Sequence, residues 1–430
     1  MAETIVVEPL ARSTGHQSWF ASNLVKALVD AGEVPVLITF DGMHDDADLA
    51  LRAQGIRTRR VSTSIPNCLK WVFSKVTGVA LGSAAAPSGV RWPLQMYWYN
   101  QIAIAMSIVY ACRAAPSGVP CVLHILAPPS WVALGCFATG RRSDTKAAVT
   151  AFDTFSRFRG ISRVVRRLCR SKALTIVVQT ESIGHNWARQ VGSGSVRLIP
   201  LPDESPAQAF QGGRSESRRL LGLPDGRPIV AIIGNIGPRK GYIELFRAVR
   251  GRPKTFRILL LGDTGPWTSP DPVDVAQEAG WLEDTIIRKT FLPERLMPAL
   301  FAAVDCVALL YREPNASSGI LSLCQQYRVP VIATRDGEIG VKVRSENLGL
   351  TVDPNDPAAV AEALDLTLAY AGGRKSPSGF DPGARNPAAE KVLPFSWRAV
   401  GVAHRRLYEE LKFGVEGRQS DNQPAALFDD

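Results

Sequence analysis

Short apolar runs rich in β-branched residues alternate with longer amphipathic segments across residues 228–368. Such runs favour buried parallel strands, and the amphipathic segments between them favour helices. The alternation therefore predicts a doubly wound parallel sheet. The predicted strands are residues 228–234, 256–262, 285–291, 306–311 and 330–334, and the predicted helices begin at 241 and span 274–279, 294–303, 319–327 and 358–368.

The first half of the chain shows the same order less clearly. An apolar run at residues 5–9 leads through a glycine-containing loop, 13–16, to an amphipathic segment at 19–31. A second apolar run follows at 34–40, so the segment predicts a βαβ unit with a right-handed crossover. Residues 64–120 mix Pro, Gly and Ser with aromatic residues and indicate inserted helices and loops. Further strands are predicted at 121–126, 147–152, 174–179 and 196–200.

A length of 430 residues exceeds what one hydrophobic core usually supports, which predicts two domains. Pro, Gly, Ser and Gln are frequent in residues 201–214, as is typical of a hinge. We therefore predict an α/β fold of two Rossmann-like, doubly wound parallel-sheet domains. The expected divisions are residues 1–200, residues 201–394, a closing helix at 395–415 and a disordered tail at 416–430.

Positive charge is concentrated in the first half. Residues 1–200 hold 22 Lys and Arg against 11 Asp and Glu, whereas residues 201–430 hold 28 against 29. Six arginines lie in a helix-like run at 156–172, which is either a solvated basic face or a surface for anionic lipid or a phosphorylated ligand. Aromatic residues are not interleaved with this run as they are in nucleic-acid platforms, so we expect no nucleic-acid partner.

The cysteines and the apolar segments bear on the compartment. Seven cysteines without a C-x-x-C pair argue against a disulfide framework and against a zinc site. The N-terminus shows no secretory signal, and the most apolar stretch, residues 102–112, is too short to span a bilayer. We expect a cytoplasmic protein, either free in the cytoplasm or peripheral to the inner face of the membrane through its basic half.

Two loops follow predicted strands at the carboxyl edge of the second sheet, where such folds bind ligands. Residues 234–241 contain Gly234, Arg239 and Lys240, a combination suited to a diphosphate or to an ordinary tight turn with solvated cations. Residues 315–321 contain Ser317, Ser318 and Gly319 ahead of an apolar helix, which indicates either an anion site at the helix start or a simple N-cap. Together the two loops predict a metal-free cradle for a nucleotide diphosphate.

A third loop, residues 336–340, follows the strand predicted at 330–334. Its Glu338 is expected to be exposed, where it contacts a sugar hydroxyl or belongs to a plain surface turn. Asp271 and Asp274 lie outside the cradle and are expected to be solvated rather than to bind a metal.

In its order of motifs the chain resembles glycosyltransferase family 4, whose members have the GT-B fold. The matching segments are Gly234 to Gly241, Leu261-Gly262-Asp263, Phe291-Leu292-Pro293, Ser318-Gly319-Ile320-Leu321, Val329 to Ala333 and Gly349 to Asp353. Phe395-Ser396-Trp397 and the segment up to Tyr408 look like the terminal helix of such proteins. The resemblance implies that residues 395–415 return to the first domain, residues 1–200, and that the two domains face a central cleft. The resemblance implies an enzyme that transfers a sugar from a nucleotide diphosphate sugar to an acceptor such as a polysaccharide, a glycolipid or an envelope polymer.

The resemblance also implies a role for each candidate residue. Retention of anomeric configuration, with the leaving phosphate as base and without a metal cofactor, is the chemistry expected of such a family member. The first domain would be the acceptor side and the second the donor side. On the first domain, Gly15 and His16 would line the cleft facing the sugar, and His124 would contact the sugar or the acceptor. On the second domain, Arg239 and Lys240 would hold the diphosphate beside Gly234. Ser317, Ser318 and Gly319 would bind phosphate.

The chain departs from the family pattern at three positions. Family members usually carry Arg where this chain has Asn235, and Glu where it has Asn315 and Leu323. Leu323 has no atom that accepts a hydrogen bond from a ribose. A non-catalytic partner or scaffold subunit with a degenerate donor site therefore remains an alternative, as does a sugar-nucleotide epimerase. The remaining histidines, His44, His185 and His404, are expected at the surface.

Overall fold

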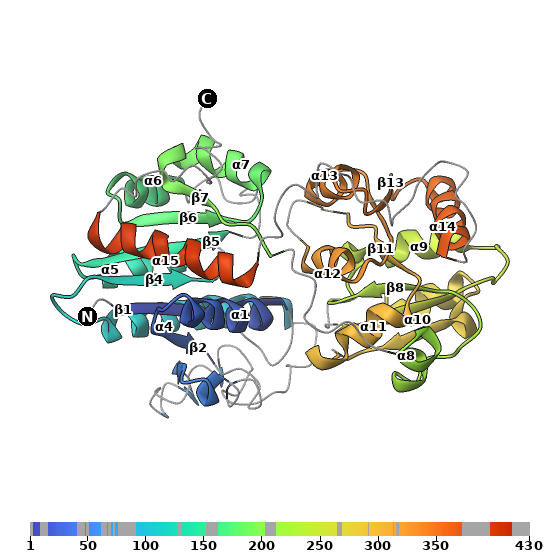
Figure 1. The fold of residues 1–430 in the computed structure, drawn as a ribbon, viewed down its shortest axis with the longest axis horizontal. Coiled ribbons are helices and arrows are strands. Elements are labelled where there is room, and N and C mark those ends of the chain that lie inside the picture. Colours follow the sequence, from blue (N-terminus) through green and yellow to red (C-terminus); the bar gives the residue numbers. More distant parts are fainter. Residues whose placement is uncertain are drawn as a thin grey trace. The chain divides into compact units, whose positions relative to one another are not determined.

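A computed structural model gives the fold as two compact units, Met1–Pro202 with Phe395–Asp430 and Asp203–Pro394. Each unit is described by itself (Figure 1). The residues described are 3–8, 16–40, 48, 51–61, 67, 70–71, 74–75, 92–126, 131–151, 162–202, 212–264, 269–290, 292–312, 314, 318–371 and 396–414. The predicted linker at 372–390 and the predicted tail at 416–430 lie outside these residues.

The first unit contains a seven-stranded parallel sheet in the order β3-β2-β1-β4-β5-β6-β7. The central strands are buried on both faces, which explains why their sequences are mostly apolar. The strand order changes direction between β1 and β4, as in doubly wound folds. The strands are β1 (Glu3–Glu8), β2 (Pro35–Thr39), β3 (Arg57–Arg60), β4 (Cys121–Ile125), β5 (Thr145–Ala151), β6 (Leu174–Val178) and β7 (Val196–Leu198).

Helices cover both faces of this sheet. One face packs against four helices, and the other packs against α1 and the C-terminal helix α15. Figure 1 shows α1 and α15 side by side, and Gly401 permits this contact because a Cβ there would lie 2.1 Å from the Ala27 carbonyl oxygen. The helices are α1 (His16–Asp30), α4 (Trp92–Ala114), α5 (Trp131–Gly140), α6 (Ser162–Arg170), α7 (Glu181–Val191) and α15 (Trp397–Phe413).

The edge strand β3 was not predicted. Its sequence, Arg-Thr-Arg-Arg, has no apolar run, and its residues alternate between exposed and half-buried. It pairs in parallel with β2, so the backbone of the neighbouring strand specifies it rather than its own side chains. Charged side chains on an edge strand also disfavour pairing with other chains.

The second unit contains a six-stranded parallel sheet in the order β10-β9-β8-β11-β12-β13. With the first sheet, it confirms the predicted fold class of two doubly wound α/β units. The strands are β8 (Ile229–Ile233), β9 (Arg257–Leu261), β10 (Thr285–Arg288), β11 (Cys306–Leu309), β12 (Val331–Thr334) and β13 (Gly349–Val352).

Two layers of helices enclose the second sheet, one on each face. The helices α11, α12 and α13 share one core with the sheet, and α9, α10 and α14 share the other. The helices are α8 (Arg214–Leu220), α9 (Tyr242–Val249), α10 (Pro272–Glu278), α11 (Met297–Ala303), α12 (Gly319–Tyr327), α13 (Gly337–Ser345) and α14 (Pro357–Ala371).

The helix α13 replaces the loop predicted at residues 336–340. Glycines at positions 337 and 340 lower helix propensity, which concealed the helix in the sequence. Gly337 has a φ of 68°, and a Cβ there would lie 2.4 Å from the carbonyl oxygen of Pro314. The close approach of another segment therefore requires glycine at the start of this helix.

No helix in the described part of the chain is long and apolar enough to cross a membrane. Residues 102–112 lie within α4.

Candidate functional site

The loop after β8 passes unusually close to two neighbouring strand ends. Gly262, at the end of β9, has a φ of 146°, and a Cβ there would lie 1.6 Å from the Gly234 carbonyl oxygen. Gly241 has a φ of 79°, and a Cβ there would lie 2.0 Å from the carbonyl oxygen of Leu310, just after β11. Because these glycines have no side chain, residues 234–241 can lie directly against the carboxyl edge of the sheet, where α/β folds bind ligands.

Lys240 lies at the centre of this edge and is only 8% exposed. Its Nζ donates a hydrogen bond to Tyr311 Oη at 2.5 Å and lies 4.4 Å from the centroid of the same ring. A Cβ on Gly234 would lie 3.3 Å from Nζ, so a side chain at position 234 would crowd the ammonium group. These contacts hold the ammonium in one place.

Arg239 lies near the same aromatic ring. Its guanidinium carbon is 5.5 Å from the Tyr311 ring centroid, and the residue is exposed. The backbone N–H of Arg312 donates to the Arg239 carbonyl at 3.1 Å and ties the loop to the segment after β11. The structure therefore gathers two adjacent cations around one buried tyrosine.

Ser318 is the N-cap of α12, as the sequence predicted for Ser317 or Ser318. Its Oγ accepts from the Leu321 N–H at 3.3 Å and lies 3.4 Å from Tyr311 Oη. The helix starts at Gly319, so unsatisfied backbone N–H groups face the same region. Ser317 lies outside the described residues. Residues 78 positions apart in the chain, Lys240 and Ser318, thus meet through Tyr311.

Tyr311 is the residue that sequence reasoning missed. It ends the run predicted as a strand at 306–311, where an apolar aromatic residue is read as core. The available signal was its position, because it follows β11 at the edge that also holds Lys240 and Ser318.

Glu338 lies in the first turn of α13 and is half-buried, so the expectation of an exposed loop residue was wrong. Its backbone N–H donates to the Pro314 carbonyl at 3.1 Å. Its Oε1 is buried and has no hydrogen-bond partner among the described residues.

Two predicted site residues, Gly15 and His16, lie at the first glycine-containing loop, and the structure describes only the backbone of His16. Gly15 lies outside the described residues. His16 is the first residue of α1, and its side chain is outside the described set. Their assignment to the cleft stays a prediction.

His124 was predicted to contact the sugar or the acceptor, and the structure places it in the core of the first unit. Its side chain is fully buried in β4, its Nδ1 lies 2.6 Å from Tyr408 Oη, and its Nε2 lies 2.7 Å from Thr150 Oγ1. Both ring nitrogens are occupied by residues of the same unit. His124 therefore fastens α15 to the sheet.

His404 was expected at the surface and is instead buried against His124. The ring centroids are 5.1 Å apart, and His404 Nδ1 lies 2.8 Å from the Val400 carbonyl oxygen. Burial lowers the pKa of His404 to about 4, and burial together with His404 lowers the pKa of His124 well below 6.5. The third histidine expected at the surface, His185, is exposed as predicted, and His44 lies outside the described residues.

This histidine pair predicts acid sensitivity in the first unit. Between pH 6.5 and about 4, these histidines are protonated in the unfolded chain but stay neutral in the folded unit. The free energy of unfolding therefore falls as the pH falls. Each histidine should contribute about 1.4 kcal/mol of lost stability per pH unit below 6.5. Hydrogen exchange of β4 and α15, corrected for intrinsic rates, measures this between pH 7.5 and 5.

The variant His404→Gln should weaken that pH dependence by about half, whereas His185→Gln, at an exposed position, should leave it unchanged. A wild-type protein equally protected at pH 7.5 and pH 5 would contradict the assignment of two neutral histidines.

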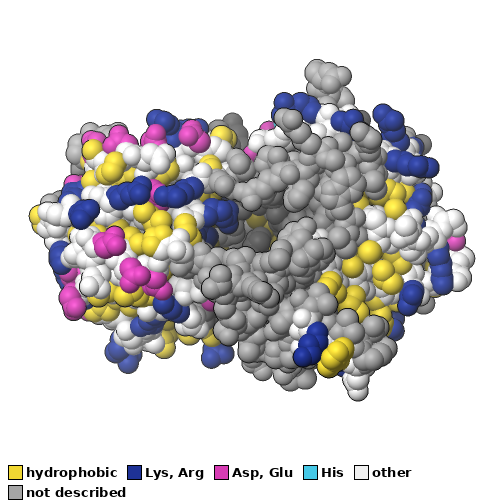
Figure 2. All heavy atoms as spheres, turned by 180° about the vertical axis from the view of Figure 1, so that it is seen from behind, with side chains coloured by type: hydrophobic (Ala, Val, Ile, Leu, Met, Phe, Trp, Pro, Cys, Tyr) yellow, Lys and Arg dark blue, Asp and Glu magenta, His cyan; other side chains and the backbone are white. Residues whose placement is uncertain are grey.

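The basic run predicted at residues 156–172 contains α6. Its Arg166, Arg167 and Arg170 are exposed, and Arg166 Nε donates to the Gln190 carbonyl at 2.5 Å. The backbone of Arg163 is described without its side chain, and Arg157 and Arg159 lie outside the described residues. On the face drawn in Figure 2, the charged side chains of the first unit are mostly Lys and Arg, and those of the second unit are of both signs.

The positions that depart from the family pattern differ in their surroundings. Asn235 is exposed, while Leu323 is half-buried and packs against the core beneath α12. Asn315 lies outside the described residues.

Asp271 caps α10 and forms an ion pair with Lys289 at 3.1 Å. Within the described ranges no group of three His, Cys, Asp or Glu side chains is placed to hold a metal ion.

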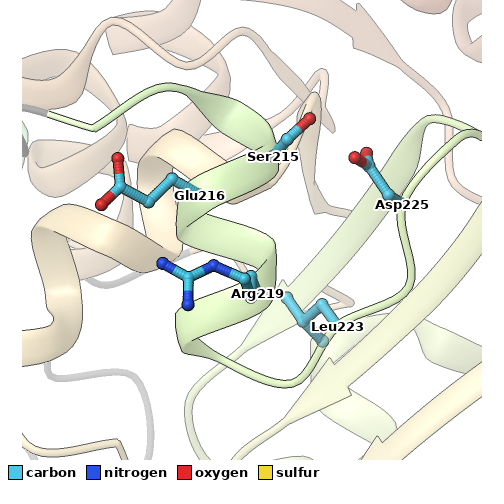
Figure 3. A pocket seen from close by; sticks show the side chains of 5 residues that line it. All are labelled: Ser215, Glu216, Arg219, Leu223 and Asp225. Carbon is cyan, nitrogen blue, oxygen red and sulfur yellow. The ribbon is translucent and has the colours of Figure 1, made fainter.

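An open hollow of about 600 Å³ lies beside α8, away from these residues. Figure 3 shows its lining side chains, which are Ser215, Glu216, Arg219, Leu223 and Asp225. Asp225 precedes β8, so the hollow belongs to the amino edge of the sheet. Its two carboxylates also disfavour a phosphate ligand. We do not assign it to the site.

Comparison with known proteins agrees with this geometry. Residues 227–369 match the family model of Glycosyl transferases group 1. A D-inositol 3-phosphate glycosyltransferase of Corynebacterium glutamicum is 32% identical over 261 residues, which are 57% of this chain and 60% of that protein. The protein of the same name from Nocardia farcinica is 36% identical over 215 residues, 46% of each chain. The chain thus spans about half to three-fifths of the length of these relatives.

Solved structures show the same fold over nearly the whole chain. A glycosyltransferase from Rickettsia africae has a TM-score of 0.66 at 15% identity and covers 96% of this chain and 99% of its own. Sucrose-phosphate synthase from Thermosynechococcus elongatus has a TM-score of 0.66 at 18% identity, covering 96% and 100%. Anabaena HepE, solved in complex with UDP and glucose, has a TM-score of 0.63 at 12% identity, covering 95% and 99%.

These likenesses define the class of fold as GT-B. Residues 227–369, which lie in the second unit, are similar to Glycosyl transferases group 1, and the predicted resemblance to glycosyltransferase family 4 is confirmed.

Proposed function

We propose that this protein is a glycosyltransferase that binds a nucleotide diphosphate sugar at the carboxyl edge of the second sheet. The observation that carries the proposal is the contact of Lys240 and Ser318 through Tyr311 inside the segment matched by the glycosyltransferase family model. Lys240 and Arg239 neutralise the diphosphate, and Ser318 and Gly319 donate to it from the start of α12. Gly234 leaves room for the backbone to approach the ligand.

The leaving group needs no metal in this proposal. Two cations and a helix N-terminus offset its negative charge, and a metal would need carboxylates that are not gathered among the described residues. Transfer proceeds with retention of configuration, and the departing phosphate accepts the proton of the acceptor hydroxyl. Gly15 and His16 face the transferred sugar. These roles follow from the family resemblance.

The acceptor that the observations favour carries a phosphate group. Residues 1–200 have twice as many basic as acidic residues, and three arginines of α6 are exposed. The curated relatives are named for D-inositol 3-phosphate. We therefore assign the first unit to a phosphorylated acceptor, with peripheral contact to anionic membrane through the same basic surface.

The free thiols of Cys112, Cys306 and Cys324 accord with a reducing, cytoplasmic compartment.

A thermal-shift and transfer experiment tests the proposal. Purified protein is melted with UDP, GDP, ADP and dTDP and with their common sugars, without metal and with EDTA. A ligand at about 100 times its Kd should add about 2.7 kcal/mol of stability, which gives a measurable shift in Tm. The sugar nucleotide that binds is then incubated with inositol 3-phosphate and, as the matched control, with inositol.

Product with inositol 3-phosphate but not with inositol supports the phosphorylated acceptor. Product analysis also separates glycosyl transfer from epimerisation, which changes the sugar nucleotide without any acceptor. A protein that neither binds a nucleotide nor forms a product contradicts the proposal.

A second candidate function is a partner subunit that keeps the fold but binds no donor. Leu323 favours it, because an aliphatic side chain packed on the core cannot hold a ribose hydroxyl. In that case the thermal-shift series would show no ligand, and co-purification with a catalytic partner would be the next measurement.

A further inference from the structure

The hydroxyl group of Tyr311 connects the two halves of the proposed diphosphate site. The residue is 4% exposed and follows β11. Its Oη lies 2.5 Å from Lys240 Nζ and 3.4 Å from Ser318 Oγ. A core position would not require these contacts, because phenylalanine would fill the same volume.

The chemistry of the ammonium fixes the direction of the first hydrogen bond. A lysine ammonium has only donors, so Tyr311 Oη accepts from Lys240. In the contact between Tyr311 Oη and Ser318 Oγ either hydroxyl can donate. When a phosphate accepts the serine hydrogen, the tyrosine hydrogen is the one that points to Ser318 Oγ, which also accepts from the Leu321 N–H. In that arrangement the serine hydroxyl is a donor at the start of α12.

The tyrosine ring also holds the charges of the site. Lys240 Nζ and the Arg239 guanidinium lie 4.4 and 5.5 Å from its centroid. Two adjacent cations repel each other, and the negative face of an aromatic ring attracts both. The ring and the hydroxyl of one residue therefore fix a pair of cations and orient a serine.

We propose that Tyr311 is a positioning residue for the nucleotide diphosphate: its hydroxyl holds the Lys240 ammonium in place and directs the Ser318 hydroxyl so that both donate to the phosphates. The inference rests on the proposed function of this site. It assigns no contact between Tyr311 and the reacting atoms.

The variant Tyr311→Phe tests the inference because it keeps the ring and removes only Oη. Calorimetry is carried out with whichever of UDP, GDP, ADP or dTDP binds the wild type, and with the corresponding monophosphate. The affinity ratio of diphosphate to monophosphate should fall about tenfold, the scale of a lost charge-assisted hydrogen bond. A merely structural tyrosine would weaken both ligands alike and leave the ratio unchanged.

A matched control is Tyr327→Phe, at the C-terminal end of α12 in the same unit, where the ring stacks on Phe301 with centroids 4.9 Å apart. It should retain the wild-type ratio. The double variant Tyr311→Phe/Ser318→Ala should lose less than the product of the two single losses, because the serine hydroxyl depends on the tyrosine for its direction.

A second pair of variants reaches the same site without altering Tyr311, in case Tyr311→Phe does not fold. Ser318→Thr keeps the hydroxyl and the cap and should keep the ratio, whereas Ser318→Ala should lower it.

An unchanged ratio in folded Tyr311→Phe, or equal ratios in the two Ser318 variants, would overturn the positioning role and leave the proposed function intact. A wild-type protein that binds none of the four diphosphates would overturn both.

Discussion

Replacing Lys240 by alanine should weaken binding of the donor diphosphate by roughly 10- to 150-fold, equivalent to about 1.5–3 kcal/mol. Lys240 is 8% exposed and its ammonium is held by Tyr311, so the residue contributes its charge without a large cost of ordering the side chain. Its removal leaves the phosphates with Arg239 and the start of α12. Isothermal calorimetry with the diphosphate that stabilises the wild type measures the loss.

Lys254→Ala is the matched control for that experiment. Lys254 precedes β9, at the opposite edge of the sheet, and pairs with Asp284 at 3.2 Å. Nucleotide affinity should stay unchanged in this variant because Lys254 lies far from the carboxyl edge. The variant should also stay folded, since a partly exposed ion pair contributes little to stability. Equal affinities in wild type and folded Lys240→Ala would remove Lys240 from the donor site.

Replacing Gly241 by alanine should destabilise the second unit by at least about 3 kcal/mol and abolish nucleotide binding. The new Cβ would lie 2.0 Å from the Leu310 carbonyl oxygen, and a backbone φ of 79° is unfavourable for alanine. Leu310 precedes Tyr311, so relief of the clash would displace Tyr311 and Lys240 together. Urea unfolding at neutral pH measures the loss of stability, and calorimetry measures binding.

Gly280→Ala separates the clash from the backbone strain. Gly280 has a φ of 74°, close to that of Gly241, but a Cβ there would meet nothing within 4 Å. This variant should lose only about 1–2 kcal/mol, the cost of left-handed backbone in a residue other than glycine. Similar losses in the two variants would show that the close approach of the loop to β11 is not required.

The positions of several site residues followed from sequence because they depend on local rules. Gly234 and Lys240 follow an apolar strand, and Ser318 precedes an apolar helix, so their places at the carboxyl edge came from the order of elements. The N-cap at Ser318 is likewise a property of neighbouring residues. These features need no knowledge of distant contacts.

Other features depend on residues far apart in the chain. The edge strand β3 has no apolar pattern and forms because β2 offers it an unpaired backbone edge. The helix α13 begins at a glycine because Pro314 leaves no room for a Cβ. Neither pattern is visible in a window of sequence.

The sequence by itself determined the two doubly wound units and the edge of the sheet at which ligands are expected, because the period and order of apolar residues specify both. Only the tertiary structure decided which side chains meet there. It brought Tyr311 between Lys240 and Ser318. It also buried His124 against His404 and against Tyr408, which lies 284 residues further along the chain than His124. Burial and side-chain contact are properties of packing between distant segments, and a local pattern does not contain them.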